Sequence, residues 1–268
     1  MPENYFLTWL FLLPPEYSRL KISYFDSSLS PAPQRVICAL VPQRAACYSR
    51  FNTDQFSQYF CRRDTGNAMN EKFYDLKKEK QDRIINAALK VFALNGYKHA
   101  STDDIIAEAG ISKGLLFHYF GSKLGLYAFL FDYSSHYAVV ELRSGVSRHE
   151  KDYFEIQTRI AAAEAALEAQ FPYITLFLDS ILRETCAEAV EAVSDSRTMV
   201  AACYEELLSG ADLSSFQSAD EVEKLTQIIS YTKQGLLRSH LEDPVFRPDA
   251  LNDEIANLLA FLRANFAR

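Results

Sequence analysis

Between Lys98 and Lys123 the chain groups side chains that could bind the bases and phosphates of a nucleic acid. Lys113, Phe117 and His118 lie within one stretch of eight residues. Lysine donates hydrogen bonds to base edges or phosphates, an aromatic ring packs on a thymine methyl group, and histidine or tyrosine reaches phosphate oxygens. A short surface helix that exposes bulky aromatic residues is unusual for a merely solvated face. The stretch is therefore interpreted as a probe for the major groove.

Two short helices joined by a turn would position these side chains. A hydroxyl from Ser101 or Thr102 can cap the first helix, because it accepts from a backbone N–H that has no partner within the helix. Gly110 can end it in the left-handed conformation that costs glycine nothing. Ser112 can cap the second helix, which we expect from about Lys113 to Phe120.

The spacing of apolar residues assigns the two faces of the second helix. Leu116 and Phe120 are four residues apart and can face inward together. The side chains left to look outward or sideways are Lys113, Leu115, Phe117, His118 and Tyr119. A further helix should begin at Ser122, where free N–H groups and Lys123 could bind a phosphate. Helix pairs with a glycine turn are also common packing units, so the lysine and aromatic content carries the interpretation.

From Ile105 to Lys123 the chain reads I-I-A-E-A-G-I-S-K-G-L-L-F-H-Y-F-G-S-K, which resembles the signature of TetR/AcrR-type transcriptional regulators. The segment from Arg83 to Tyr97 resembles the first helix of that family. The resemblance implies a DNA-binding role for Thr102, Lys113, Gly114, Leu115, Phe117, His118, Tyr119 and Lys123.

Three positions depart from the family pattern. Ile106 stands where a small alanine is frequent, which would set the two helices slightly further apart. Leu115 stands where a hydroxyl residue is frequent, and leucine cannot donate to a phosphate. Asp103 stands where some members place a basic residue that reads a base. The fold implied by the resemblance is unaffected by these three departures.

The charge is divided unevenly along the chain, although the formal net charge is −7. Residues 72–123 contain nine Lys and Arg against six Asp and Glu, whereas residues 124–268 contain 12 against 23. A local basic patch is what attracts phosphates. The acidic remainder would be repelled by a duplex and would orient the basic end toward it.

The first 68 residues differ in character from the rest. They hold six of the nine prolines and three of the five cysteines, without a persistent helical or alternating pattern. The apolar stretch from Tyr5 to Leu13 lacks the basic lead and the cleavage site of a signal peptide. Two interpretations remain: an accessory arm that is disordered or weakly docked, or a misassigned start with translation beginning at Met69. We favour the second.

The pattern after Leu124 is helical almost throughout, so the sequence predicts an all-α protein. We expect helices at about 122–142, 150–169, 172–192, 195–208, 219–241 and 248–266. A three-helix DNA-binding domain over residues 76–123 would precede a larger helical domain for ligand binding and dimerisation over 124–268. We call the helix-turn-helix at residues 101–123 the reader. The helix after the reader would act as a lever between the two domains. Candidates for an apolar ligand pocket are Tyr137, Phe177, Tyr204, Tyr231 and Gln234, although most aromatic residues here should be core.

The last two predicted helices each have one apolar face, which could finish the core of a monomer or pair with a second copy. A dimer gains affinity by spanning two half-sites one helical turn apart, and the resemblance implies that these helices pair in a four-helix bundle. We therefore expect a homodimer, with interface candidates Leu225, Ile229, Leu236, Leu251, Ile255, Leu258 and Leu262.

The function expected from the sequence is a cytoplasmic repressor that a small molecule releases from double-stranded DNA. The alternative is an architectural or cell-division DNA-binding protein on the same scaffold, controlled by a protein partner. We expect no enzyme activity, cofactor or metal, because the sequence has no glycine-rich phosphate loop, metal-ligand spacing or nucleophile motif. No apolar run approaches the length of about 20 residues that spans a bilayer.

Overall fold

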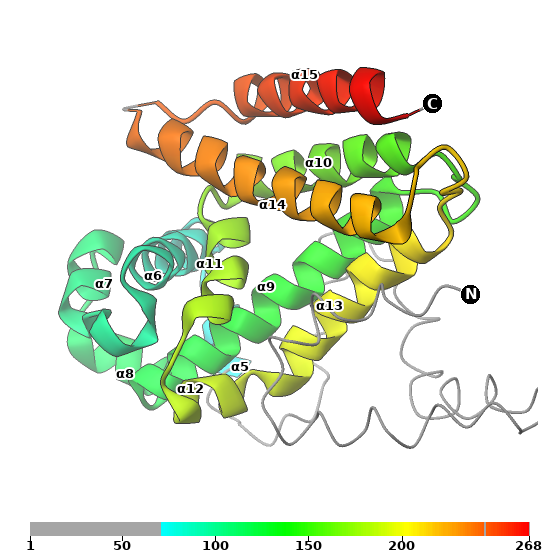
Figure 1. The fold of residues 1–268 in the computed structure, drawn as a ribbon. Helices are drawn as coiled ribbons and strands as arrows, with labels where there is room; N and C mark the ends of the chain where they lie inside the picture. Colours follow the sequence, from blue (N-terminus) through cyan, green and yellow to red (C-terminus); the bar gives the residue numbers. More distant parts are fainter. Residues whose placement is uncertain (1–70, 244, 268) are drawn as a thin grey trace, which may run out of the picture.

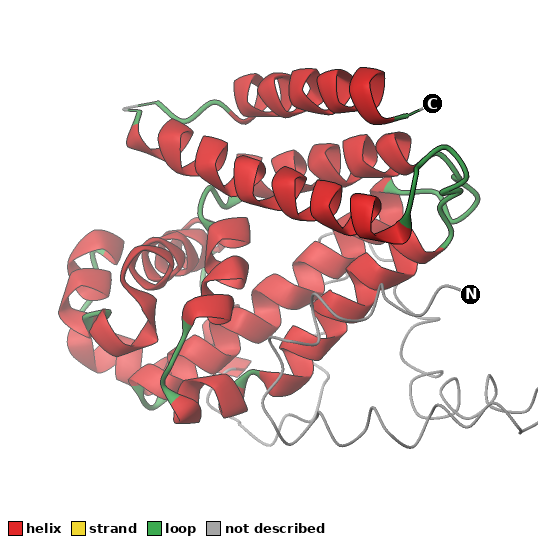
Figure 2. Cartoon of the chain, viewed as in Figure 1, coloured by secondary structure: helices red, strands yellow, loops and turns green. Residues whose placement is uncertain are grey.

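The computed structural model describes residues 71–243 and 245–267, and within them the fold is helical without a β-strand (Figures 1 and 2). The expectations for residues 1–68, and for a start at Met69, lie outside the described residues. The helices are α5 (Glu71–Tyr74), α6 (Lys78–His99), α7 (Thr102–Ala109), α8 (Lys113–Phe120), α9 (Lys123–Gly145), α10 (Tyr153–Gln170), α11 (Ile174–Ser180), the 3₁₀ helix η3 (Ile181–Arg183), α12 (Ala187–Ala192), α13 (Ser194–Ser209), α14 (Ala219–Glu242) and α15 (Pro248–Phe266).

The first four helices gather at one end of the molecule, and the long helix α9 runs from there into the remainder (Figure 1). Along α9 most residues are buried, because α10, α11 and α13 all pack against it. The far end from the reader is layered, with α15 and α14 lying over α10 in Figure 1. Helix α9 is therefore the structural link that the sequence predicted between the two parts.

The prediction of one helix over 172–192 is wrong. The structure has α11, the short η3 and α12 instead, with an extended segment at 184–186. The carboxylate of Glu184 accepts the backbone N–H groups of Thr185 and Cys186 at 2.9 Å each. A side chain that binds its own backbone in this way competes with the helical hydrogen bonds. The other long helices begin and end within three residues of the predicted bounds.

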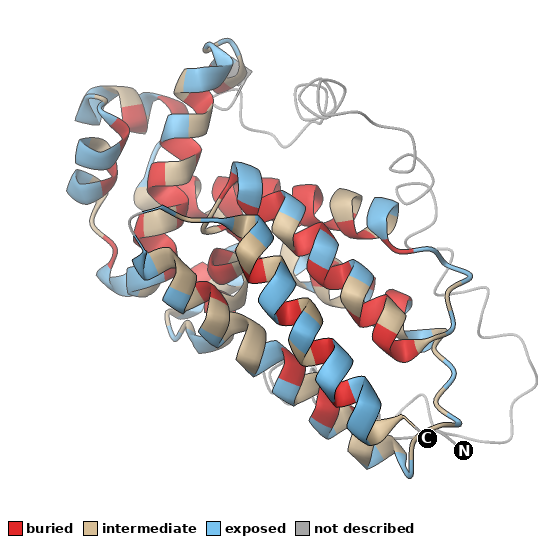
Figure 3. Cartoon of the chain, turned by 90° about the horizontal axis from the view of Figure 1, so that it is seen from above, coloured by how far each residue is buried: buried red, intermediate tan, exposed pale blue. Residues whose placement is uncertain are grey.

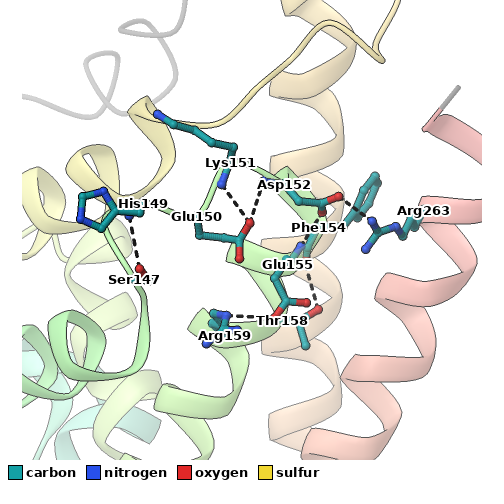
Figure 4. Close-up of polar contacts among 10 residues, drawn as sticks. All are labelled: Ser147, His149, Glu150, Lys151, Asp152, Phe154, Glu155, Thr158, Arg159 and Arg263. Carbon is teal, nitrogen blue, oxygen red and sulfur yellow. Dashed lines mark hydrogen bonds and ion pairs between the residues drawn. The ribbon is translucent and has the colours of Figure 1, made fainter.

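Helix α15 is fixed to the start of α10 by a polar contact as well as by apolar packing. The Asp152 side chain caps α10 by accepting the N–H of Glu155 at 2.8 Å, and it also pairs with the guanidinium of Arg263 near the end of α15 (Figure 4). A carboxylate at a helix N-terminus is favoured by the helix dipole. Asp152 thus caps α10 and also links it to the end of α15, in addition to the apolar packing between the two helices.

Candidate nucleic-acid interface and effector cavity

The turn between α7 and α8 forms as the sequence predicted. Ser101 caps α7, with its hydroxyl accepting the N–H of Asp103 at 3.1 Å, and Ser112 caps α8 by accepting the N–H of Leu115 at 3.3 Å. Gly110 adopts the left-handed conformation, with φ of 63° and ψ of 43°. A residue with a Cβ atom is strained there, so Gly110 fixes the angle between the two helices.

A second glycine sets how α9 leaves the reader. A Cβ atom added to Gly125 would lie 2.1 Å from the carbonyl oxygen of Phe120, so only glycine allows this approach. The Ser122 hydroxyl caps α9 by accepting the Gly125 N–H at 2.9 Å. The first N–H groups of a helix have no acceptor within the helix and can bind an anion. The predicted phosphate site therefore lies beside the reader, at the start of α9.

The side chains of α8 divide into two faces. Lys113, Gly114 and His118 are exposed, and Leu115 and Phe117 are partly exposed. Thr102 at the start of α7 and Lys123 at the start of α9 are also partly exposed. These residues lie on three consecutive helices at one end of the molecule, where they could contact a duplex together.

The prediction that Tyr119 lies on the outer face of α8 is wrong, because Tyr119 is only 7% exposed. It lies three residues after the buried Leu116 and therefore on the same face of α8. Its ring packs edge-on against Phe73 of α5, with ring centroids 5.9 Å apart. Helix α5, which covers Tyr119, precedes the predicted DNA-binding domain of residues 76–123. The spacing of residues within α8 alone could not indicate that α5 covers this face.

Two exposed side chains at this end were missed by the sequence interpretation. Lys98 and His99 end α6 and are exposed beside the reader. Lys123 lies against them: its ammonium stands 4.7 Å from the centre of the Tyr97 ring and donates to the Lys98 carbonyl at 3.4 Å. Partial burial lowers the pKa of Lys123. The excess of Lys and Arg over residues 72–123 was the sequence signal that could have pointed to Lys98. That excess is spread over the whole segment, so it did not distinguish the end of α6.

Lys113 has an intramolecular partner in the free protein. Its ammonium lies 3.0 Å from a carboxylate oxygen of Asp103 on α7, and both side chains are largely exposed. An exposed pair of this kind contributes little to stability because water and salt screen it. Lys113 can therefore exchange Asp103 for DNA at small cost, but Asp103 brings a negative charge to the same surface.

A cavity of about 130 Å³ lies between α9, α10, α11, α13 and α14, remote in sequence from the reader. Tyr204 and Gln234 line it, in agreement with their selection from the sequence. Tyr137, Phe177 and Tyr231 do not line this cavity. Tyr137 packs edge-on against Phe171 and donates to Gln170 at 2.6 Å.

Of the other two candidates, Phe177 lies in the core and Tyr231 lies on the surface. Phe177 is fully buried against Phe92, Tyr127 and Phe131. Tyr231 is 72% exposed on the outer face of α14. Spacing shows which residues share a helix face, but not which element covers that face.

Most residues predicted for a dimer interface are buried within the single chain, and that prediction was wrong for them. Packing of α14 and α15 against α10 and each other encloses Leu225, Ile229, Leu251, Ile255 and Leu262. Leu236 and Leu258 are partly buried against the same core. The apolar side chains that do reach the surface are Ile228 and Tyr231 on α14 and Phe261 on α15, at 46%, 72% and 64% exposure. In Figure 3 the helix leading to the C-terminus carries its exposed residues on the side facing the viewer.

The comparisons with known proteins match the reader end of the chain. Residues 84–129 match the model of the bacterial regulatory proteins of the tetR family. This segment, which includes α7 and α8, is therefore similar to the DNA-binding part of tetR-family regulators. Members of this family are DNA-binding regulators and not enzymes.

Curated relatives match this chain over limited stretches. The transcriptional activator FasR of Mycolicibacterium smegmatis is 34% identical over 96 residues, which are 36% of this chain and 41% of that protein. The uncharacterized regulator YuxN of Bacillus subtilis is 45% identical over 56 residues, or 21% and 19% of the two chains. The matched stretches thus span less than half of these relatives.

A solved structure extends the likeness in fold beyond the reader. A TetR-family regulator from Chloroflexus aurantiacus aligns with a TM-score of 0.53 and 20% identity, covering 74% of this chain and 98% of that one. At this identity the likeness concerns the fold alone. Among the described residues, no helix is both long and apolar enough to cross a membrane, and no group of three or more potential ligands could hold a metal ion.

Proposed function

We propose that this protein is a homodimeric transcriptional repressor that a small molecule releases from its DNA site. In this proposal residues 76–123 bind DNA, and residues 124–268 bind the effector and the second copy. The observation that carries the proposal is that α9 serves both sites. It begins at Lys123 beside the reader, and its residues Phe131 and Ala138 line the cavity. Lys123 and Ala138 are separated by about 22 Å at about 1.5 Å of rise per residue.

A second connection between cavity and reader runs through Glu184. Ile181 and Leu182 of η3 line the cavity, and Glu184 follows them in the chain. Its Oε2 accepts the backbone N–H of Tyr97 at 2.7 Å, at the end of α6. Tyr97 in turn lies under the ammonium of Lys123. A ligand that displaces η3 would therefore move the end of α6 and a proposed phosphate contact together.

The geometry supports a switch only if the ligand distinguishes two states. A ligand with equal affinity for the DNA-bound and released conformations shifts neither population. The effector must therefore bind better when α9 or η3 has moved away from the DNA-bound arrangement. The relative FasR is named an activator, so a transcription assay has to establish the direction of regulation.

The dimer in this proposal uses Ile228, Tyr231 and Phe261, the large apolar side chains that α14 and α15 expose. Aromatic residues at the centre of an interface contribute most of its binding energy. The partly buried Leu236 and Leu258 would lie beside them. Two readers joined in this way would contact two half-sites of a pseudo-palindromic DNA sequence.

DNA binding is tested by fluorescence anisotropy on fragments selected from a random duplex library, at several salt concentrations. Lys123→Ala should weaken binding to all fragments alike and reduce the salt slope by about one unit, because one phosphate contact is lost. Lys113→Ala and Phe117→Ala should instead change which fragments are preferred. Lys224→Ala is the matched control, since Lys224 is exposed on α14 and away from the reader. Unchanged DNA binding in all three reader variants would contradict the assignment.

A further inference from the structure

The cavity that we propose as the effector site is unusually rich in carboxylates. Glu164 and Glu168 are one turn apart on α10, and Asp179 comes from α11; all three line the cavity. Glu164 and Glu168 are 8% and 5% exposed. Acidic side chains are almost never so deeply buried without a partner of opposite charge.

Only one of the three carboxylates is paired with a cation. The ammonium of Lys233 on α14 forms an ion pair with Glu164, which also accepts the hydroxyl of Tyr204 at 2.8 Å. Glu168 accepts a hydrogen bond from Thr175. Within the described part of the chain, neither Glu168 nor Asp179 has a cation within ion-pair distance. Two acids, the buried Glu168 and the half-buried Asp179, thus face the cavity without an ion-pair partner among the described residues.

Burial has a direct effect on these two acids. Desolvation, with a smaller contribution from the nearby Glu164, raises the pKa of Glu168 to about 8 and that of Asp179 to about 7. Lys233 opposes the shift in both cases without cancelling it. A positive charge placed between the two carboxyl groups would favour their ionised forms.

Most of the remaining wall is apolar, although polar side chains such as Gln157, Arg197 and Gln234 also line it, and the space is small. Ile160, Ile229 and Leu237 are among the side chains that line it. The volume of about 130 Å³ is close to that of an engineered cavity of about 150 Å³ that binds benzene. The space therefore fits a body of about one ring.

We propose that the cavity binds a small organic cation, a protonated amine on an apolar body, with its ammonium group at Glu168 and Asp179. The proposal rests on the proposed function only in taking this cavity as the effector site. An anionic ligand would bring a fourth negative charge to three carboxylates, which outnumber the two cations of the wall, Arg197 and Lys233; Lys233 is already engaged by Glu164. A neutral ligand would leave the two unpaired acids as they are.

Affinity for the cation should rise with pH until the ligand itself loses its proton. Below pH 7 both acids hold their protons, and the cation must displace them; above pH 8 they are ionised before it binds. The charged or titratable groups that face or act on this site come from five elements: Glu164, Glu168, Asp179, Arg183, Arg197, Tyr204 and Lys233. Burial and the neighbouring Glu164 raise the pKa of Tyr204, so the tyrosine stays neutral over this range.

The test compares three probes of one shape by isothermal titration calorimetry on the full chain without DNA: benzylammonium, benzyl alcohol and benzoate. Benzylammonium should bind about tenfold tighter than benzyl alcohol, the value expected of one hydrogen bond to a charged group, and benzoate should bind weakest. Glu168→Gln and Asp179→Asn should each remove most of the preference for the ammonium probe without affecting benzyl alcohol. Glu242→Gln, an exposed acid on α14 outside the cavity, is the control and should keep the preference.

Three results would overturn the cation site: equal affinity for benzylammonium and benzyl alcohol, tighter binding of benzoate, or no binding of benzylammonium. Circular dichroism establishes that the variants remain folded. DNA release, followed separately by anisotropy, distinguishes this proposal from the proposed function. Release by a neutral or anionic molecule would leave the function standing without the cation site. Binding of benzylammonium that leaves the DNA complex intact would support the site and contradict its role as effector site.

Discussion

Replacing Glu168 with glutamine should stabilise the protein at neutral pH, although it removes an ionisable group from the cavity wall. Glu168 is 5% exposed and lacks an ion-pair partner among the described residues. Burial raises its pKa from 4.5 to about 8. Between these two values the unfolded chain releases a proton that the folded chain retains. Stability therefore falls as pH rises through this window.

The size of the effect follows from the shift. Each unit of pKa difference corresponds to about 1.4 kcal/mol. Because of this one group, the free energy of unfolding of the wild-type chain is about 3 kcal/mol lower at pH 7 than below pH 4. Glutamine has nearly the same shape, and its side-chain oxygen can still accept the Thr175 hydroxyl that now donates to Glu168. Glu168→Gln should therefore be about 3 kcal/mol more stable at pH 7, which raises the melting temperature by about 6 to 12 °C for a domain of this size.

Urea unfolding monitored by circular dichroism at pH 5, 7 and 8 measures the effect. The difference in free energy of unfolding between variant and wild type should grow by about 3 kcal/mol from pH 5 to pH 8. Glu242→Gln controls for the loss of one negative charge, since Glu242 is exposed on the same protein, and it should show no such growth. A difference that stays constant with pH would refute the claim that Glu168 is buried without a countercharge.

Three further outcomes are expected. Tyr231→Ser and Phe261→Ser should each raise the dimer dissociation constant at least tenfold in analytical ultracentrifugation, because exposed aromatic anchors contribute most to an interface; an unchanged constant in both would place the dimer contact elsewhere. Glu184→Gln should keep DNA affinity within about threefold but weaken ligand-induced release in an anisotropy assay about tenfold, since each 1.4 kcal/mol of lost coupling is one factor of ten; full release would exclude this path. Asp103→Asn should raise DNA affinity about threefold at low salt and less at high salt, and a loss of affinity would mean that the pairing of Asp103 with Lys113 orients the lysine for binding.

The local signals in the sequence were sufficient where a feature depends on neighbouring residues alone. The hydroxyl cap at Ser112 and the left-handed Gly110 form as predicted, Ser101 is the cap of the two residues considered for α7, and a helix begins after Ser122 as expected. Each is decided within about four residues of chain, which is the range over which capping operates. The bounds of the last helices were predicted for the same reason, with a proline at the start of α15.

Features that depend on distant partners were not predicted. The break after η3 has no glycine or proline to mark it, and it is stabilised by Glu184 binding the backbone of Tyr97, 87 residues away in sequence. Tyr119 is covered by Phe73 of a helix that precedes the predicted reader. The apolar face of α14 was recognised, but α10 and α15 of the same chain cover it. In each case the missing information was the identity of the covering element.

Helix α14 gives the proposed switch a second output besides α9. Lys233 on its inner side pairs with Glu164 of α10, while Tyr231 on its outer side is exposed for a partner. A cation bound at Glu168 and Asp179 adds positive charge close to Lys233, and like charges in a cavity of low dielectric constant repel one another strongly. Because the ammonium of Lys233 is carried by α14, relief of this repulsion would move the helix outward, against the proposed dimer contact. In the proposed dimer, a single helix would couple ligand binding to the dimer geometry, and the spacing of two readers on DNA would depend on that geometry.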